Sequence, residues 1–299
     1  MANWDDMRVF LAVARGESLS RAARDLRMDP ATVGRRVARL EDRLGVTLFV
    51  KSPQGYALTE AGERMLGPAE QAESAFSTGI GAVTGLGEKL TGSIRVGAPD
   101  GCANFLLPQV CSAIQADNPG LEIQILALPR VVNLSKREAD MAVTVSPPTA
   151  GRLLIQKISD YRLHLAVPKA MAERISGFAD LRDQAVIGYI PDMIFDKELD
   201  YLANVGLPAV KLGSNSISVQ LMLMRAGRGV GIVHDFAMPF APELRIVLRD
   251  AVSLARTFYL VRHESDRHSD RLNRFAEALA TGMRAEIARL EALTHSGSA

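Results

Sequence analysis

This chain of 299 residues has few cysteines, little net charge and no long apolar run. No apolar stretch approaches the ~20 residues that a membrane-spanning helix needs. The N-terminus has neither the basic nor the apolar segment of a secretion signal. The cysteines, Cys102 and Cys111, are too few for a disulfide framework. We therefore expect a cytoplasmic protein that has no membrane partner.

Formal net charge is only +1, so any surface that binds nucleic acid must be local. A chain of this length should divide into two or three domains. No sequence motif indicates a serine–histidine–aspartate or cysteine–histidine catalytic set. His263 and His268 lack the spacing of metal ligands. We expect no catalysis, metal ion or cofactor.

The first 60 residues show the spacing of three short helices. One apolar stripe at helical spacing marks the first helix and consists of Met7, Phe10, Leu11 and Ala14. Gly16 should end this helix, and Ser20 is placed to cap a second one over 21–26. A third helix should begin with Asp29 as its cap and Pro30 at its first position, where the missing N–H costs nothing.

This third helix has two contrasting faces. Its apolar stripe consists of Val33, Val37, Leu40 and Leu44, and its polar stripe of Thr32, Arg35, Arg36 and Arg39. Guanidinium groups can pair with phosphates or with guanine edges, and a threonine methyl can contact thymine. Residues 20–51 contain eight basic residues against four acidic ones, so the charge is concentrated here. The pattern is typical of a recognition helix.

A hairpin follows, with strands expected over 47–51 and 56–58 and a turn between them. Such a wing would place Lys51 and Gln54 beside the DNA backbone or in the minor groove. The alternative is a plain three-helix bundle with a solvated arginine face. The cap, the arginine stripe and the hairpin occur in the order that a winged helix-turn-helix needs, and this favours DNA binding.

Four segments carry a family resemblance: SLSRAARDL at 18–26, ATVGRRVARLE at 31–41, LGVTLF at 44–49 and LTEAG at 58–62. They resemble the DNA-binding domain of LysR-type transcriptional regulators. We expect DNA contacts from Ser20, Arg21, Ala31, Thr32, Arg35, Arg36, Arg39, Lys51 and Gln54. The family more often has glutamine in place of Asp29 and serine in place of Gly34, so its operator preference cannot be transferred.

Residues 59–90 are predicted to form a linker helix and a hinge, after a DNA-binding domain over 1–58. The helix carries one apolar stripe, and such a stripe needs a partner. We expect a dimer contact through Met65, Ala69, Ala72, Phe76 and Val83. In the resembled family this helix joins DNA-binding domains into dimers. The alternative is packing against the effector domain of its own chain.

From Thr91 onward strands alternate with helices, which indicates α/β architecture with mainly parallel sheets. Two series of similar makeup suggest two lobes with a cleft between them, the first over 91–160 plus 263–299 and the second over 161–262. The expected elements include helices over 105–117 and 195–205 and separate strands over 153–158 and 161–167.

Short segments of this region also resemble the family's effector domain, which is itself similar to periplasmic solute-binding proteins. They are GSIRVG at 92–97, LLP at 106–108, NPG at 118–120 and AGRGVG at 226–231. The resemblance implies that the final helix returns to the first lobe. It also implies that closure of the cleft on a small molecule rearranges the oligomer and its DNA.

Ligands of open α/β sheets bind beyond the carboxyl ends of strands, near helix N-termini. That rule selects Asp100, Gly101, Cys102, Arg130, Ser146, Tyr189, Ser214, Asn215 and Ser216 as effector-binding candidates. The group at 214–216 could bind a carboxylate or merely cap a helix. Asp100 either caps a helix or faces the cleft, where it would suit an effector that carries an amino group or hydroxyls. Cys102 could also act alone as a thiol sensor.

The sequence therefore predicts a LysR-type regulator that is not an enzyme. We expect a homotetramer, built as a dimer of dimers, that binds an interrupted palindrome in double-stranded DNA and responds to a small effector. One rival is a solute-binding receptor, which explains 91–299 but not the N-terminal domain. The other is an enzyme with an appended DNA-binding module, which no motif favours.

Overall fold

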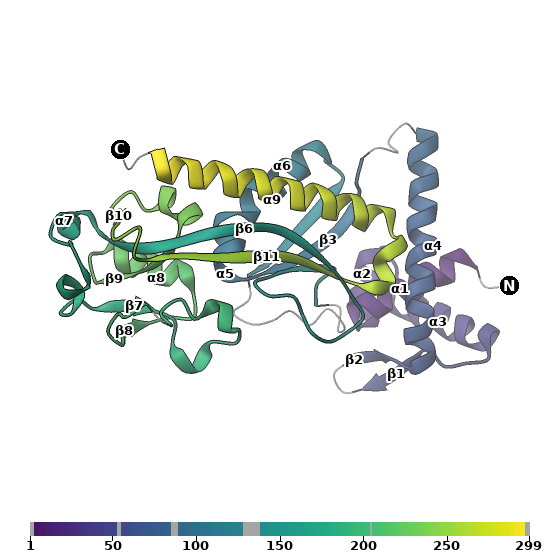
Figure 1. The fold of residues 1–299 in the computed structure, drawn as a ribbon. Helices are drawn as coiled ribbons and strands as arrows, with labels where there is room; N and C mark the ends of the chain where they lie inside the picture. The colour runs from purple at the N-terminus through teal and green to yellow at the C-terminus, as the bar shows by residue number, and fades with distance from the viewer. Residues whose placement is uncertain (1–2, 53–54, 85–88, 128–137, 204, 297–299) are drawn as a thin grey trace. The chain divides into compact units, whose positions relative to one another are not determined.

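The computed structural model describes residues 3–52, 55–84, 89–127, 138–203 and 205–296 (Figure 1). The chain forms two compact units, the first of residues 1–88 with 268–271 and the second of residues 89–267 with 272–299. None of the described helices is both long enough and apolar enough to cross a membrane.

The first unit contains the helices and the hairpin that the sequence predicts. Its elements are α1 Trp4–Gly16, α2 Leu19–Leu26, α3 Pro30–Leu44, β1 Phe49–Ser52, β2 Gly55–Leu58 and α4 Glu60–Thr84. The strands β1 and β2 pair antiparallel, with Lys51 opposite Tyr56. The prediction of a winged helix-turn-helix followed by a long helix is therefore confirmed at the level of the fold.

Local capping rules account for most helix ends in this unit. The Asp29 carboxylate accepts hydrogen bonds from the backbone N–H groups of Ala31 and Thr32, at 2.8 and 3.4 Å, as a helix cap should. The prediction of Ser20 as the cap of α2 is wrong. Ser18 fills that role by accepting from the N–H of Arg21, so the helix starts at Leu19.

A small apolar core holds the three helices against the hairpin. Its buried members are Val9, Phe10, Leu11, Val13, Ala22, Ala23, Val33, Val37, Leu40, Leu48, Phe49 and Ala69. Leu44 was expected in this core but is 36% exposed, because α3 ends there and Gly45 turns the chain with a positive φ of 68°.

The start of α4 is fastened to the hairpin. The hydroxyl of Thr59 donates to the carbonyl of Thr47 at 2.7 Å and accepts from the N–H of Gly62 at 3.0 Å. A Cβ at position 62 would lie 2.2 Å from the carbonyl oxygen of Leu48. Gly62 therefore lets α4 approach the hairpin more closely than any other residue would.

Among the described residues of the second unit, nine strands form one mixed sheet in the order β4-β3-β5-β11-β6-β9-β7-β8, with β10 paired to β6. The strands are β3 Gly92–Ala98, β4 Leu121–Ala127, β5 Met141–Thr144, β6 Leu153–Pro168, β7 Val186–Gly188, β8 Val210–Gly213, β9 Val230–His234, β10 Leu244–Ile246 and β11 Ser253–His263. We call the part around β3, β4 and β5 lobe I and the part around β7, β8 and β9 lobe II.

Pairing within each lobe is parallel, as predicted: β3 pairs with β4 and β5, and β7 with β8 and β9. The middle of the sheet was not predicted. The expected strands 153–158 and 161–167 form one strand, β6, which pairs antiparallel with β11 over eleven residues of the latter. These two strands run side by side and link the lobes (Figure 1), so the expected boundary at residue 160 falls inside β6.

Helices flank the sheet at α5 Asp100–Phe105, α6 Leu107–Asp117, α7 Lys169–Ala172, α8 Ile217–Arg225 and α9 Asp270–Ser296. Short 3-10 turns lie at Phe178–Leu181, Pro191–Met193, Lys197–Leu199, Asp235–Phe240 and Glu264–His268. The expected helix over 105–117 is broken at Leu106, the residue between α5 and α6. The helix expected over 195–205 is wrong, because only the turn Lys197–Leu199 forms there.

The final helix α9 contacts lobe I, as predicted, and also the strand β6 that links the lobes. A Cβ at Gly282 would lie 2.6 Å from Val110 of α6, which shows how closely the helices pack. Nearer its end, the carboxylate of Glu291 accepts from the N–H of Arg162 in β6 at 2.8 Å. Helix α9 therefore packs against a helix of lobe I and is also hydrogen-bonded to a strand of the sheet.

Candidate functional site

The outward face of α3 is the candidate DNA-binding surface. Ala31 and Arg35 are exposed, and Thr32 is half-buried. One guanidinium nitrogen of Arg35 donates to the Thr32 hydroxyl at 3.1 Å, which leaves the rest of its planar donor set open to solvent. A positively charged, exposed face on a helix with a capped N-terminus can contact base edges and phosphates in a major groove.

Arg39 is exposed on α3, as predicted, and also pairs with a buried carboxylate. Its guanidinium donates to both carboxylate oxygens of Asp6, a residue of α1 that is completely buried. Arg43 donates to the same carboxylate at 3.3 Å. A buried carboxylate needs such partners, so Arg39 also holds α3 against α1. Its side chain is still 47% exposed, and its contact with DNA stays a prediction.

Other predicted DNA contacts lie around this face. Ser20 and Arg21 are exposed on α2, while Arg36 lies 3.8 Å from the carboxylate of Asp5. Gly34 faces away from the exposed stripe, because a Cβ there would lie 3.3 Å from the Leu19 side chain. A serine at that position would meet α2, so its absence removes no group from the exposed face.

The hairpin is positioned as a wing beside the end of α1. Lys51 is exposed on β1, and Gln54 lies outside the described residues. The N–H of Tyr56 donates to the carbonyl of Glu17 at 2.8 Å. Gly55 has a φ of 136°, and a Cβ there would lie 2.3 Å from the same carbonyl oxygen, so only glycine permits this anchoring.

The first half of α4 packs part of its apolar stripe against its own unit. Ala69 is 2% exposed and belongs to the core of its own winged unit, and Met65 packs against the same core. Neither the predicted dimer contact nor the alternative, packing on the effector domain, describes Ala69. Ala69 is therefore removed from the expected dimer surface, whereas Met65 is half-buried and its dimer contact stays a prediction.

The second half of α4 is more open. The ring of Phe76 lies 5.7 Å from that of Trp4 in α1, yet Phe76 is 55% exposed. Ala72, one turn earlier, is also exposed. The side chain of Val83 lies outside those that the structure describes. The surface for self-association therefore centres on Ala72 and Phe76, which stays a prediction.

A cavity in the second unit lies between the lobes. Its walls consist of Pro99, Gly101, Cys102, Val145, Tyr161, Tyr189, Leu199, Tyr201, Ile217, His234 and Phe258. The free space inside is close to that of one water molecule. Gly101, Cys102 and Tyr189 were predicted to face such a cleft, and the structure brings them together with residues that the sequence did not indicate.

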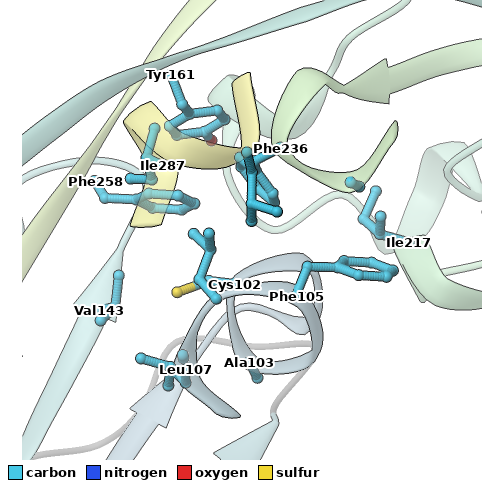
Figure 2. Close-up of a cluster of buried hydrophobic side chains, with 14 of the residues drawn as sticks. Cys102, Ala103, Phe105, Leu107, Val143, Tyr161, Ile217, Phe236, Phe258 and Ile287 are labelled. Carbon is cyan, nitrogen blue, oxygen red and sulfur yellow. The ribbon is translucent and has the colours of Figure 1, made fainter. Parts of the chain in front are cut away.

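Stacked rings build one wall of this cavity (Figure 2). The rings of Tyr161 and Phe258 lie 4.1 Å apart at an angle of 20°, and Phe236 packs edge-on against Tyr161. Cys102 approaches from α5 on the other side. Because Tyr161 lies on β6 and Phe258 on β11, the two linking strands supply the floor where the lobes meet.

Two polar atoms at this wall lack hydrogen-bond partners among the described residues: the Tyr161 hydroxyl and Nδ1 of His234. The Tyr201 hydroxyl lies 3.2 Å from Nε2 of His234 and also interacts with the Tyr161 hydroxyl. Burial lowers the pKa of His234 to about 3, so its ring is neutral. Both atoms can therefore bind an uncharged polar group.

Asp100 connects the two lobes at the edge of this cavity. It opens α5 in lobe I, but it is not the N-cap, which is Pro99. Its carboxylate accepts from the N–H of Ser218 at 3.0 Å and from the Ser216 hydroxyl at 3.1 Å, both at the start of α8 in lobe II. Asp100 therefore faces the junction between the lobes.

The other predicted effector residues have mixed placements. The Ser146 hydroxyl donates to Asp196 and forms a second polar link between the lobes. Ser216 caps α8 by accepting from the N–H of Val219 at 3.3 Å, which supports the capping alternative. The Ser214 hydroxyl accepts from the N–H of Ser216 at 3.1 Å. Asn215 is half-buried, and Arg130 lies outside the described residues.

Both cysteines are buried thiols. Burial raises the pKa of Cys102 far above its ordinary value and that of Cys111 to about 12. The thiolate is the reactive form of cysteine, and it is suppressed at both positions. This environment argues against the alternative that Cys102 acts as a thiol sensor.

Sequence reasoning missed Tyr161, Tyr201 and His234. His234 ends strand β9, so the rule that ligands lie beyond strand ends could have identified it. Tyr201 lay in a region expected to be helical, which hid its role. Tyr161 lies in mid-strand, and only the crossing of β6 between the lobes brings it to the cavity.

Comparison with known proteins is consistent with both units. Residues 4–63 match the family described as bacterial regulatory helix-turn-helix protein, lysR family. Residues 87–284, two thirds of the chain, match the LysR substrate binding domain. The chain belongs to the LysR family. As a LysR-type regulator it is a DNA-binding transcription factor with an effector-binding domain.

Known LysR-type regulators resemble the chain along most of its length. The Mau operon transcriptional activator of Paracoccus denitrificans is 26% identical over 239 residues, which are 78% of this chain and 80% of that protein. A full-length, singly substituted OxyR from Pseudomonas aeruginosa shares the fold with a TM-score of 0.66 at 20% identity, covering 95% of each chain.

A third similar protein is the full-length regulator LysG of Corynebacterium glutamicum, whose structure is described as containing the bound effector Arg. Its TM-score is 0.59 at 18% identity, covering 95% of this chain and 99% of that one. At this identity the likeness concerns the fold.

Proposed function

We propose that this LysR-type regulator is a cytoplasmic homotetramer that binds an interrupted palindromic operator. Its binding to DNA changes when a small molecule enters the cavity between lobes I and II. The observation that carries the DNA-binding part is the exposed, positively charged face of α3 with Ala31, Thr32 and Arg35. The cap at Asp29 and the anchored wing hold this face in a fixed orientation within its unit.

The effector part of the proposal rests on the cavity. Its walls come from both lobes and from the strands that link them, so a molecule bound there contacts each part that would have to move. The similar LysG structure contains an effector, which supports a ligand-binding role for the corresponding unit. A ligand that favours one arrangement of the lobes shifts their equilibrium and, through α4, the oligomer.

The test compares two arginines of the same helix. Arg35→Ala should weaken binding to the DNA upstream of the protein's own gene by about 1–3 kcal/mol, because Arg35 is exposed and held only by Thr32. Arg39→Ala should mainly lower the melting temperature, because it leaves the buried Asp6 carboxylate with fewer partners. Fluorescence anisotropy measures the first effect and thermal unfolding the second.

Arg284→Ala, an exposed substitution on α9 in the other unit, controls for general loss of positive charge. Unchanged operator affinity in Arg35→Ala would remove α3 from the proposed interface. A loss of affinity equal in Arg35→Ala and Arg284→Ala would show that only overall charge matters.

A further inference from the structure

The start of helix α8 is an anion site that the chain fills by itself. The helix has nine residues, and the N–H of Ser218 in its first turn has its partner in lobe I rather than in the helix. One carboxylate oxygen of Asp100 accepts from the N–H of Ser218 at 3.0 Å and from the hydroxyls of Ser216 and Ser218 at 3.1 and 3.2 Å. This is the geometry expected for a bound carboxylate ligand.

The second carboxylate oxygen is also occupied. The amide of Asn104 donates to it at 3.0 Å and to the Ser218 hydroxyl at 2.9 Å. Asp100 and Asn104 both belong to α5 in lobe I, whereas Ser218 belongs to lobe II. Three of the four hydrogen bonds to this carboxylate join the lobes, so an incoming ammonium group would have to compete with them for the carboxylate.

We propose that Asp100 is an internal substitute for an effector carboxylate, so that the adjoining cavity selects small uncharged molecules and rejects carboxylates. This inference rests on the proposed binding of an effector between the lobes and specifies the chemistry of that effector. A second carboxylate near α8 would lose the helix N–H groups to Asp100 and would also face its negative charge.

The cavity walls independently fit an uncharged ligand. None of the described residues in the wall carries a formal charge, because the ring of His234 is neutral. Tyr161 and His234 line the cavity and are 1% and 3% exposed. The Tyr161 hydroxyl and His234 Nδ1 have no hydrogen-bond partner among the described residues. A hydroxyl or primary amide can both donate and accept, so it can satisfy these atoms. The surrounding rings favour an apolar body next to that group.

The nearest positive charge is also engaged. Arg256 donates to the carbonyl of Glu198 at 2.9 Å and lies 3.0 Å from the carboxylate of the same residue. A carboxylate in the cavity would therefore have to compete with Glu198 for this guanidinium. Both sources of positive potential beside the cavity, the α8 N-terminus and Arg256, are neutralised by acids of the chain itself.

Chemical rescue tests this inference in the full-length protein. Asp100→Ala removes a group of the size of formate, so sodium formate should bind at the start of α8 in the variant. We expect formate to raise the melting temperature of Asp100→Ala and to leave that of the wild type unchanged. Formamide at equal concentration controls for size, and sodium chloride for ionic strength. Asp183→Ala, which removes an exposed carboxylate elsewhere in the unit, is the matched variant.

The preference for uncharged over anionic ligands should also change in Asp100→Ala when larger ligands are compared. The cavity has room for about one water molecule in this structure, so an aromatic ligand enters only when the lobes separate. In that opened form, benzoate should bind Asp100→Ala about tenfold more tightly than the wild type, whereas benzamide should show no such preference. Asp100→Asn, which keeps the shape and one acceptor, should fold like the wild type and give an intermediate gain for benzoate.

Equal effects of formate on all proteins, or no gain for benzoate in Asp100→Ala, would overturn the inference. Saturable binding of benzoate to the wild type that His234→Gln abolishes would also overturn it. Failure of the proposed function would show separately, as unchanged operator affinity in Arg35→Ala, which involves no small molecule.

Discussion

His234 shows how the surroundings of one residue determine its chemistry. Its ring lies 5.5 Å from those of Tyr161 and Tyr201 and 4.8 Å from that of Phe236. No described acidic group is near enough to hydrogen-bond it, and Tyr201 is its partner at Nε2. Without a compensating charge, protonation inside this aromatic cage is unfavourable.

This environment predicts a dependence of stability on pH. The pKa of His234 falls to about 3 in the folded protein, so below pH 6.5 the unfolded chain binds a proton that the folded one does not. The free energy of unfolding should therefore decrease as pH falls from 6.5 toward 3, by about 1.4 kcal/mol per pH unit from this residue.

Chemical denaturation of the wild type and His234→Gln at several pH values measures the effect. As pH falls, the unfolding free energy of His234→Gln should rise relative to that of the wild type. Parallel pH profiles would show that His234 binds protons equally in the folded and unfolded protein, which contradicts a lowered pKa.

Residues whose roles are local could be predicted from the sequence, and residues whose partners are distant could not. Asp29 caps α3 through N–H groups two and three positions away, so its role follows from the neighbouring residues. The structural role of Arg39, its ion pair with a buried carboxylate, could not be predicted in this way. Its partner Asp6 lies 33 positions away, and only the packing of α1 against α3 shows that pairing.

At the scale of elements, the join between the wing and α4 depends on one glycine. Gly62 should not tolerate alanine, because a Cβ there would lie 2.2 Å from the carbonyl oxygen of Leu48 and the two elements would have to separate. We expect Gly62→Ala to lower the free energy of unfolding by about 1–3 kcal/mol.

Gly79, further along α4, is the matched control. A Cβ there meets nothing within 4 Å, so Gly79→Ala should raise stability by up to about 1 kcal/mol through helix propensity. Urea denaturation of the two variants should therefore give changes of opposite sign. A stabilising effect of Gly62→Ala would contradict the close packing of α4 on the hairpin.

Elements with strong local signals were predicted well, and those defined by long-range pairing were not. The capped, amphipathic α3 and the hairpin match their predicted positions closely. The segment 195–205 has apolar residues at helical spacing, but Leu199 and Tyr201 are buried as parts of irregular chain around the cavity. The continuity of β6 follows from its pairing with β11, about 100 residues later.

At the scale of the whole molecule, self-association should depend on the open half of α4. Phe76 is 55% exposed although it is large and apolar, and Ala72 lies one turn before it. Such exposure on a helix is expected of a contact surface. We predict that Phe76→Glu lowers the oligomer mass in light scattering, because the contact would then bury a charge.

Ala75→Glu adds the same charge one residue earlier, outside the apolar stripe, and should leave the mass unchanged. Equal masses for the wild type and Phe76→Glu would place the self-association surface elsewhere. The fold of each variant is checked by circular dichroism.

The long pairing of β6 with β11 has a consequence for the order in which the chain folds during synthesis. The winged unit and α4 are complete once residue 84 has left the ribosome, and their contacts join segments close in sequence. Lobe I cannot complete its sheet until β11 emerges, since β5 pairs with that strand. Nearby contacts form faster than distant ones. The DNA-binding unit should therefore be folded while the unit that senses the effector is still being made.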